Sequence, residues 1–222
     1  GPGLRVNSLE TAAMVAELTL KELGIAKNDW RKLFEVPAEQ LFTLQGQMNN
    51  FLQGKALKKG ERFGFAPVVD QVSILAHPFV PAAPALSKEK PVMVGWNADE
   101  YIFFLMTGGN LEPLKLGAKE DKRVVELLRP QYGAHAEEIV RTYRRCRPEA
   151  TASELYVAIT SIAMMGLGSI EIAEKKTRQG GAPAYLYNFC FEHGGKVPGT
   201  DYPMSTPHAM DITYKFDNAE AG

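Results

Sequence analysis

An acidic residue and a histidine lie where a nucleophilic enzyme could use them. Glu100 follows the apolar run 91–96, and His208 lies in the loop that follows a second strand-like run at 183–191. Open α/β sheets bind their ligands just beyond the carboxyl ends of the strands. A carboxylate that orients an imidazole is the supporting half of a nucleophilic triad, in which the histidine takes the proton of the nucleophile. Spacing alone also fits a simpler interpretation, a first-turn helix carboxylate and a surface loop histidine.

Strands that alternate with long helical stretches must position these two residues. The run 91–96 is continuous and apolar, as in a strand buried on both faces, and 183–191 is rich in aromatic residues. Asn97 or Asp99 is expected to cap a helix that extends through Met106. Further helices are predicted over about 119–128, 135–145 and 151–176. The alternation predicts an α/β fold, but two strands are too few for the core of a chain this long, so we expect part of a larger domain.

We expect residues 1–222 to belong to a single domain with four regions. Residues 1–62 are predicted to be mainly helical, with a first helix that Asn7 or Ser8 caps and a solvated loop over 55–62. The other regions are 63–110, with extended segments, a strand and the turn of Glu100, then 111–180, which is helical, and 181–222, with a strand and the loop of His208.

Composition excludes several classes of protein. The chain has 25 Lys and Arg residues against 26 Asp and Glu residues, a formal net charge of −1, which argues against a nucleic-acid partner. The longest apolar run, 159–170, is shorter than the roughly 20 residues that span a bilayer, so no membrane span is expected. No signal peptide is visible, and the sequence leaves the compartment open.

Cysteine and histidine usage argues against a metal centre. Cys146 and Cys190 are the only cysteines, too few for a disulfide scaffold or a cysteine-rich zinc site, and each is expected to be a small buried apolar residue. The remaining histidines, at 77, 135 and 193, are scattered along the chain. We therefore expect neither a metal ion nor an organic cofactor.

Five blocks of the chain, taken in order, carry a resemblance to a known family. They are Gly1–Gly3, Phe65–Asp70, Pro91–Glu100, Ala184–His193 and His208–Phe216. Together they resemble the type-B carboxylesterase family, which includes the cholinesterases and bacterial nitrobenzyl esterases. The resemblance implies the α/β-hydrolase fold, of which this chain would be the C-terminal portion and incomplete alone. It further implies a serine carboxylic-ester hydrolase, with a small-molecule ester as its substrate.

The resemblance also assigns roles to individual residues. Glu100 corresponds to the triad acid and His208 to the general base, while Phe103, Phe104 and Met210 match positions that bind substrate. An alternative for Phe103, Phe104 and Met106 is that they form the buried face of a helix. The chain departs from the family pattern at two positions where glycine is usual, with Tyr101 after the acid and Ala209 after the histidine.

The nucleophile itself is missing from the sequence. The family carries its serine in a Gly-x-Ser-x-Gly elbow, and no serine here has glycines at those positions; Ser169 comes nearest, in a segment predicted to be helical. The His-Gly-Gly-Gly loop of the oxyanion hole is also missing. We therefore expect the serine to lie outside this chain, in the remainder of the hydrolase domain, and the isolated chain to be inactive.

Two alternatives belong to other functional classes. A non-catalytic cholinesterase-like adhesion or binding protein would share the fold, although such relatives commonly lack triad residues. A free-standing helical interaction module would have to leave its strands unpaired.

Overall fold

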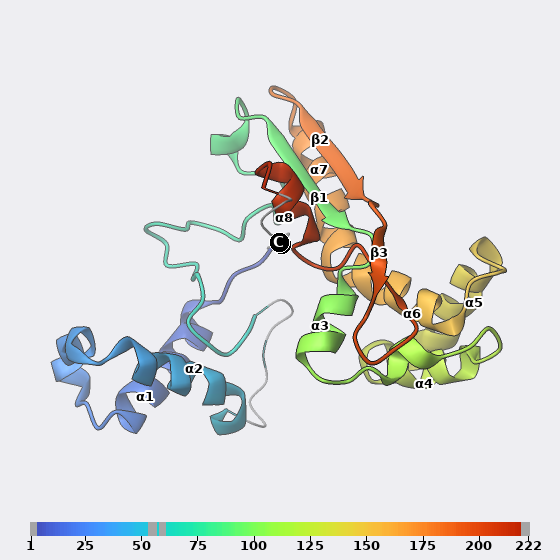
Figure 1. Cartoon of the computed structure of the whole chain (residues 1–222). Helices are drawn as coiled ribbons and strands as arrows, with labels where there is room; N and C mark the ends of the chain where they lie inside the picture. The colour runs from blue at the N-terminus through green and yellow to red at the C-terminus, as the bar shows by residue number, and fades with distance from the viewer. Residues whose placement is uncertain (1–3, 53–56, 58–60, 219–222) are drawn as a thin grey trace. The chain divides into compact units, whose positions relative to one another are not determined.

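The computed structural model describes residues 4–52, 57 and 61–218 (Figure 1). The family-like block at residues 1–3 and most of the predicted loop over 55–62 lie outside the described residues. The chain divides into two compact units, Gly3–Ser87 and Lys88–Gly222. Its assignment to a single hydrolase domain remains a prediction.

The first unit is helical, as the sequence predicts. Helix α1 (Leu9–Glu22) begins after Ser8, whose side chain accepts a hydrogen bond from the backbone N–H of Thr11. A 3-10 segment η1 (Lys27–Glu35), helix α2 (Ala38–Phe51) and a short turn η2 (Ala85–Ser87) follow. Helices α1 and α2 share a small apolar core, composed of Val15, Leu44, Met48 and Leu52. The predicted extended segment pairs with the chain before α1, where Asn7 and Val68 form a parallel bridge.

The second unit contains both predicted strands. Strands β1 (Val92–Asn97) and β2 (Ala184–Phe189) pair in parallel, in a register that runs from Val92–Ala184 to Asn97–Phe189. Parallel neighbours need a crossover connection. Helices between residues 101 and 179 supply it, and the last of them packs along the strand pair (Figure 1).

That last helix is continuous over Ala152–Gln179, with a π-helical turn in its middle. Its parts are α6 (Ala152–Ser161), η5 (Ile162–Gly166) and α7 (Leu167–Gln179). Thr151 and Glu154 form a capping box at its start, which fits the predicted beginning at 151. A Cβ at Gly166 would lie 3.1 Å from the ring of Trp96, so the glycine permits close helix–strand packing.

Strand β1 is less buried than its sequence predicts. Met93 is 72% exposed, and Val92, Val94 and Trp96 are half-buried. The expectation of a strand buried on both faces is wrong for the part of the chain that the structure describes. The long helix covers the face of β1 that carries Trp96. Because side chains alternate between the two faces along a strand, Met93 lies on the opposite face.

The other helices of this unit pack with α3 (Tyr101–Thr107) around a shared apolar core. They are η3 (Glu112–Lys115), α4 (Asp121–Tyr132), η4 (Gly133–His135) and α5 (Ala136–Cys146). Their shared core includes Ile102, Leu105, Val124, Leu128, Val140, Tyr156 and Val157. The predicted helices at 119–128 and 135–145 are thus present, with ends shifted by a few residues.

A small hairpin occupies the region that the sequence predicts to be a loop. Strands β3 (His193–Lys196) and β4 (Pro203–Ser205) pair antiparallel with an irregular register. Buried Val197 and Tyr202 anchor the turn between them, and the two residues are joined by a backbone hydrogen bond of 2.9 Å. The hairpin leads into helix α8 (Met210–Lys215), the helical turn expected near His208.

Both cysteines lie on the surface of the protein. Cys146 and Cys190 are both exposed, so the prediction that they are buried is wrong. Cys146 ends α5 and Cys190 follows β2, so each lies where the chain leaves a regular element.

Among the described residues, Ala152–Gln179 is the one helix long and apolar enough to cross a membrane. Over half of its most apolar window is buried inside the protein, as in the core helix of a soluble protein, so this is weak evidence for a span.

Candidate active site

Glu100 and His208 meet at the carboxyl ends of the two parallel strands. The Oε2 atom of Glu100 lies 2.6 Å from Nδ1 of His208. Glu100 lies three residues after the end of β1 and is only 5% exposed, while the side chain of His208, between β4 and α8, is 35% exposed. The carboxylate is therefore buried, and the imidazole can be reached from outside.

The surroundings of Glu100 determine the tautomer of His208. When Glu100 is ionised it can only accept hydrogen bonds, and Nδ1 of His208 then carries the hydrogen of this pair. The second carboxylate oxygen, Oε1, accepts a 2.8 Å hydrogen bond from the backbone N–H of Asn97. With Nδ1 engaged as a donor, Nε2 of the neutral imidazole is left as a proton acceptor.

The side chain of Asn97 connects the end of β1 to the segment around His208. It is 1% exposed, and its Nδ2 donates to the carbonyl oxygen of Pro207 at 2.8 Å and to Oδ1 of Asp211 at 3.2 Å. Asp211 also pairs with Lys215 one turn later. Although burial raises the pKa of Asp211, the hydrogen bonds from Lys215 and Asn97 outweigh it, and the net pKa is lowered.

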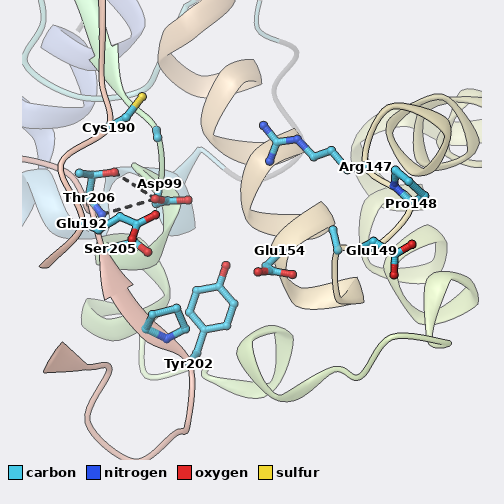
Figure 2. A pocket seen from close by; sticks show the side chains of 13 residues that line it. Asp99, Arg147, Pro148, Glu149, Glu154, Cys190, Glu192, Tyr202, Ser205 and Thr206 are labelled. Carbon is cyan, nitrogen blue, oxygen red and sulfur yellow. Dashed lines mark hydrogen bonds between the residues drawn. The ribbon is translucent and has the colours of Figure 1, made fainter. Parts of the chain in front are cut away.

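Asp99 makes a second connection to the same segment (Figure 2). Its Oδ2 accepts hydrogen bonds from the hydroxyl and the backbone N–H of Thr206, at 3.0 and 3.4 Å. Burial raises the pKa of Asp99. The expectation that Asn97 or Asp99 caps α3 is wrong, since α3 has no side-chain cap. Both side chains bind residues that lie more than a hundred positions away in the sequence.

The residue after His208 has a backbone conformation that alanine disfavours. Ala209 has φ +70° and ψ −3°, in the left-handed region. This is one of the two positions where the family pattern often has glycine, and glycine adopts that region without steric cost. The chain thus keeps the left-handed turn while lacking the residue that best fits it.

Aromatic side chains of α3 flank the imidazole. The ring centroids of Phe103 and Phe104 lie 5.7 and 5.1 Å from that of His208. The fully buried face of α3 consists of Ile102 and Leu105, while Phe103 is exposed. Both phenylalanines therefore lie on the side of the helix that meets the histidine, and neither is among its buried residues.

Met210 and Tyr101 have different surroundings. Met210 is half-buried at the first position of α8, and its backbone N–H donates to Pro207 at 3.2 Å. The ring of Tyr101 packs edge-on against Tyr156, with centroids 5.9 Å apart. Its backbone N–H donates to the hydroxyl of buried Ser161 at 3.1 Å. Tyr101 thus packs against α6, and its ring centroid lies 6.2 Å from that of Phe104.

A cavity with several charged residues in its wall lies next to the hydrogen-bonded pair Asp99 and Thr206. It has a volume of about 540 Å³, and Asp99 and Thr206 form part of its wall beside Glu154, Glu192 and Tyr202 (Figure 2). Burial raises the pKa of the Tyr202 hydroxyl, which stays protonated there. Within the described part of the chain, no cluster of three or more His, Cys, Asp or Glu side chains could hold a metal ion.

No serine in the described part of the chain is bonded to His208. Ser169 is buried in α7, where its hydroxyl donates to the carbonyl oxygens of Gly95 and Met165, in agreement with its predicted helical setting. The sequence analysis missed Asn97, Thr206 and Asp211 as contributors to the site. Asn97 lies three residues before Glu100, while Thr206 and Asp211 lie two residues before and three residues after His208. This closeness in the sequence was a signal for their role, although polar residues are common in such turns.

Comparisons with known proteins agree with this architecture. The model of the carboxylesterase family matches residues 7–222. Juvenile hormone esterase of Heliothis virescens is 25% identical over 222 residues, which cover 92% of this chain and 38% of that protein. The chain therefore spans about two-fifths of the length of this relative.

Solved structures share the fold. A carboxylesterase of Geobacillus stearothermophilus matches 96% of this chain and 38% of its own, with a TM-score of 0.57 and 24% identity. Juvenile hormone esterase of Manduca sexta, solved with a covalently attached ligand, matches 94% of this chain and 41% of its own, with a TM-score of 0.53 and 20% identity. Both relatives are α/β-hydrolase carboxylesterases, so the chain has the architecture of the C-terminal portion of that fold.

Proposed function

Because the chain belongs to the carboxylesterase family, we propose that it takes part in the hydrolysis of carboxylic esters through a Ser–His–Glu triad. In this proposal the chain contributes Glu100 and His208, and the remainder of the hydrolase domain contributes the serine. The single observation that supports it most is the 2.6 Å contact between a buried carboxylate and a partly exposed imidazole.

The proposed reaction uses the two nitrogens of His208 differently. The serine oxygen attacks the ester carbonyl carbon while Nε2 takes the hydroxyl proton, and Glu100 stays ionised beside the resulting imidazolium. The tetrahedral intermediate then expels the alcohol, which receives that proton from Nε2, and an acyl-enzyme remains. Water repeats the sequence with the same base, releases the acid and restores the serine.

Phe103 and Phe104 form the proposed apolar wall for the substrate. Their ring centroids lie 5.7 and 5.1 Å from that of His208, close enough to contact the acyl or alcohol part of an ester that is held at Nε2. Met210, two residues after His208, is proposed as a further apolar contact. This wall favours esters with an apolar group next to the reacting carbonyl.

The Glu100–His208 hydrogen bond also favours this function over non-catalytic adhesion. A binding protein of this fold has no need for a buried acid on Nδ1 of a histidine, and burying a carboxylate costs free energy unless it is hydrogen-bonded. Glu100 is buried and accepts hydrogen bonds at both oxygens. This arrangement supports the catalytic alternative.

The decisive experiment produces the chain alone and together with the remainder of its hydrolase domain. Each sample is treated with a fluorophosphonate probe and assayed with p-nitrophenyl esters. We expect the chain alone to hydrolyse esters no faster than free imidazole, and the assembled protein to turn over and carry the probe on a serine outside these 222 residues. An assembled protein that neither turns over nor takes the probe would favour the adhesion role.

A matched pair of variants tests the role of Glu100 in the assembled protein. Glu100→Gln removes the charge that holds the Nδ1 proton, so we expect kcat to fall by about 10⁴-fold, the size of the loss when a triad acid becomes an amide. Glu112→Gln is the control, because Glu112 pairs only with Lys115 on the surface. Equal activity in the two variants would exclude Glu100 from the triad.

A further inference from the structure

Asn97 directs its backbone N–H and both hydrogens of its side-chain amide to the candidate active site. Its backbone N–H binds the oxygen of Glu100 that His208 leaves free, at 2.8 Å. Both hydrogens of its side-chain amide are also directed to acceptors, the carbonyl of Pro207 and the carboxylate of Asp211. One residue therefore holds the acid and both ends of the segment that carries the histidine.

The acceptors bracket His208 in the chain. Pro207 precedes the histidine directly, and Asp211 lies in the first turn of α8, three residues after it. Between them, Ala209 has a left-handed conformation that alanine disfavours. The backbone preferences of the residues around His208 therefore do not fix the orientation of its imidazole. Contacts from outside this segment have to fix it.

Only a donor with two hydrogens fits the position of Asn97. Aspartate has the same shape, but its carboxylate accepts hydrogen bonds and donates none. It would face the carbonyl of Pro207 and the carboxylate of Asp211 with a negative charge. Replacing asparagine with aspartate thus removes both side-chain bonds without changing the volume of the side chain.

We propose that Asn97 is a positioning residue, which sets the distance and angle between Glu100 and His208 by tying Pro207 and Asp211 to the end of β1. This inference rests on the proposed role of His208 as general base, and the residue itself does not touch the substrate. Misplacing a catalytic group by about 1 Å can lower a rate by about 10²-fold. The loss should appear in kcat, with KM unchanged.

The test uses the assembled protein and two readouts. Proton NMR detects the Nδ1 hydrogen of His208, which a short hydrogen bond to a carboxylate moves far downfield, and steady-state kinetics give kcat and KM. In Asn97→Asp we expect the downfield resonance to be lost and kcat to fall by about 10²-fold. Asn110→Asp is the control, because it makes the same chemical change at an exposed position of the same unit.

A double variant tests whether the loss of kcat in Asn97→Asp comes from the missing side-chain hydrogen bonds or from general damage to the fold. Asn97→Asp with Asp211→Asn exchanges the two groups, so that the new amide at 211 can donate to the new carboxylate at 97. We expect partial recovery of the resonance and of kcat, because one of the two side-chain bonds is restored and the added charge is removed. Asn97→Asp alone with an unchanged resonance and kcat would overturn the inference.

The two proposals fail in different ways. If the wild-type assembled protein shows the downfield resonance but no esterase turnover, the proposed function is wrong and the NMR comparison still tests Asn97. If turnover is present and Asn97→Asp leaves it unchanged, the esterase function stands and the positioning role is wrong.

Discussion

Asp99 and Thr206 form three hydrogen bonds with each other. The backbone N–H of Asp99 donates to the carbonyl of Thr206 at 3.3 Å, and the carboxylate of Asp99 accepts from the Thr206 hydroxyl at 3.0 Å and N–H at 3.4 Å. Asp99 is next to Glu100, and Thr206 lies two residues before His208. These hydrogen bonds therefore join the turn of Glu100 to the segment of His208, in addition to the contacts of Asn97.

Asp99 should make the stability of the protein depend on pH. Burial raises its pKa, so the folded state binds the proton more tightly than the unfolded chain does. Stability should then fall as pH rises from the unfolded pKa of about 3.9 through the folded value, and the loss should persist at neutral pH.

Asp99→Asn keeps an oxygen acceptor for Thr206 but cannot ionise. Relative to wild type, the variant should gain stability as the pH is raised from about 3.5 to about 7. Urea unfolding at a series of pH values measures this difference, with Asp217→Asn as a control at an exposed position. A difference that stays constant across the series would contradict the expectation.

Ala209→Gly should stabilise the protein. Alanine in the left-handed region costs about 1–2 kcal/mol, and glycine removes this cost while adding some entropy to the unfolded chain. We expect a net gain of about 1 kcal/mol, measured as a shift in the urea midpoint. Ala158→Gly is the matched control: Ala158 lies inside α6, so the same replacement should cost about 1 kcal/mol there. A loss of stability in both variants would show that Ala209 is not strained.

Gly95→Ala should destabilise the strand pair. A Cβ at Gly95 would clash first with the backbone carbonyl oxygen of Tyr187 on β2 and would lie 2.5 Å from Cγ of its ring, so the backbone of the strand pair and the ring would both have to move. The hydroxyl of that ring lies 3.5 Å from the carboxylate of Asp211, and displacement would disturb this contact as well. We expect a loss of about 1–3 kcal/mol in urea unfolding.

The control for Gly95→Ala is Gly46→Ala. Gly46 lies inside α2 with nothing within 4 Å of an added Cβ, so alanine should raise stability there by about 0.5–1 kcal/mol. Opposite signs for the two substitutions are expected, and a neutral Gly95→Ala would show that β2 can shift at Tyr187 without loss of stability.

Phe104→Ala should change the choice of ester in the assembled protein. The ring lies 5.1 Å from that of His208, and an aromatic contact with an apolar substrate is worth about 0.5–1.5 kcal/mol. We expect kcat/KM for p-nitrophenyl octanoate to fall by up to about tenfold, and that for p-nitrophenyl acetate to change much less. Phe42→Ala, at an exposed position of the first unit, should alter neither value. Equal losses for both esters would argue against a role of Phe104 in substrate binding.

Several elements could be predicted because their signals are local. The helix that starts after Thr151 has a capping residue, a glutamate three positions later and a long apolar pattern, and it forms as expected. Likewise, Glu100 lies three residues after an apolar strand, so its place near the end of that strand needs only the strand itself.

Other features could not be predicted because distant contacts decide them. Asn97 and Asp99 are good capping residues, yet their side chains bind Pro207, Asp211 and Thr206 instead. The β3–β4 hairpin is short and irregular, and buried Tyr202 anchors it without any alternating pattern. Cys146 and Cys190 are exposed because each lies where the chain leaves a helix or a strand.

Sequence by itself determined most of the helices, the two strands that pair in parallel and the family-like blocks, and it nominated Glu100 and His208 as the acid and the base. These depend on residue type and on short-range spacing, which the chain carries locally. Only the tertiary structure decided that Glu100 and His208 lie 2.6 Å apart, and that Asn97 and Asp99 hold the two segments together. Those contacts join residues more than a hundred positions apart, and they exist only because parallel pairing of β1 and β2 brings the carboxyl ends of both strands to one edge.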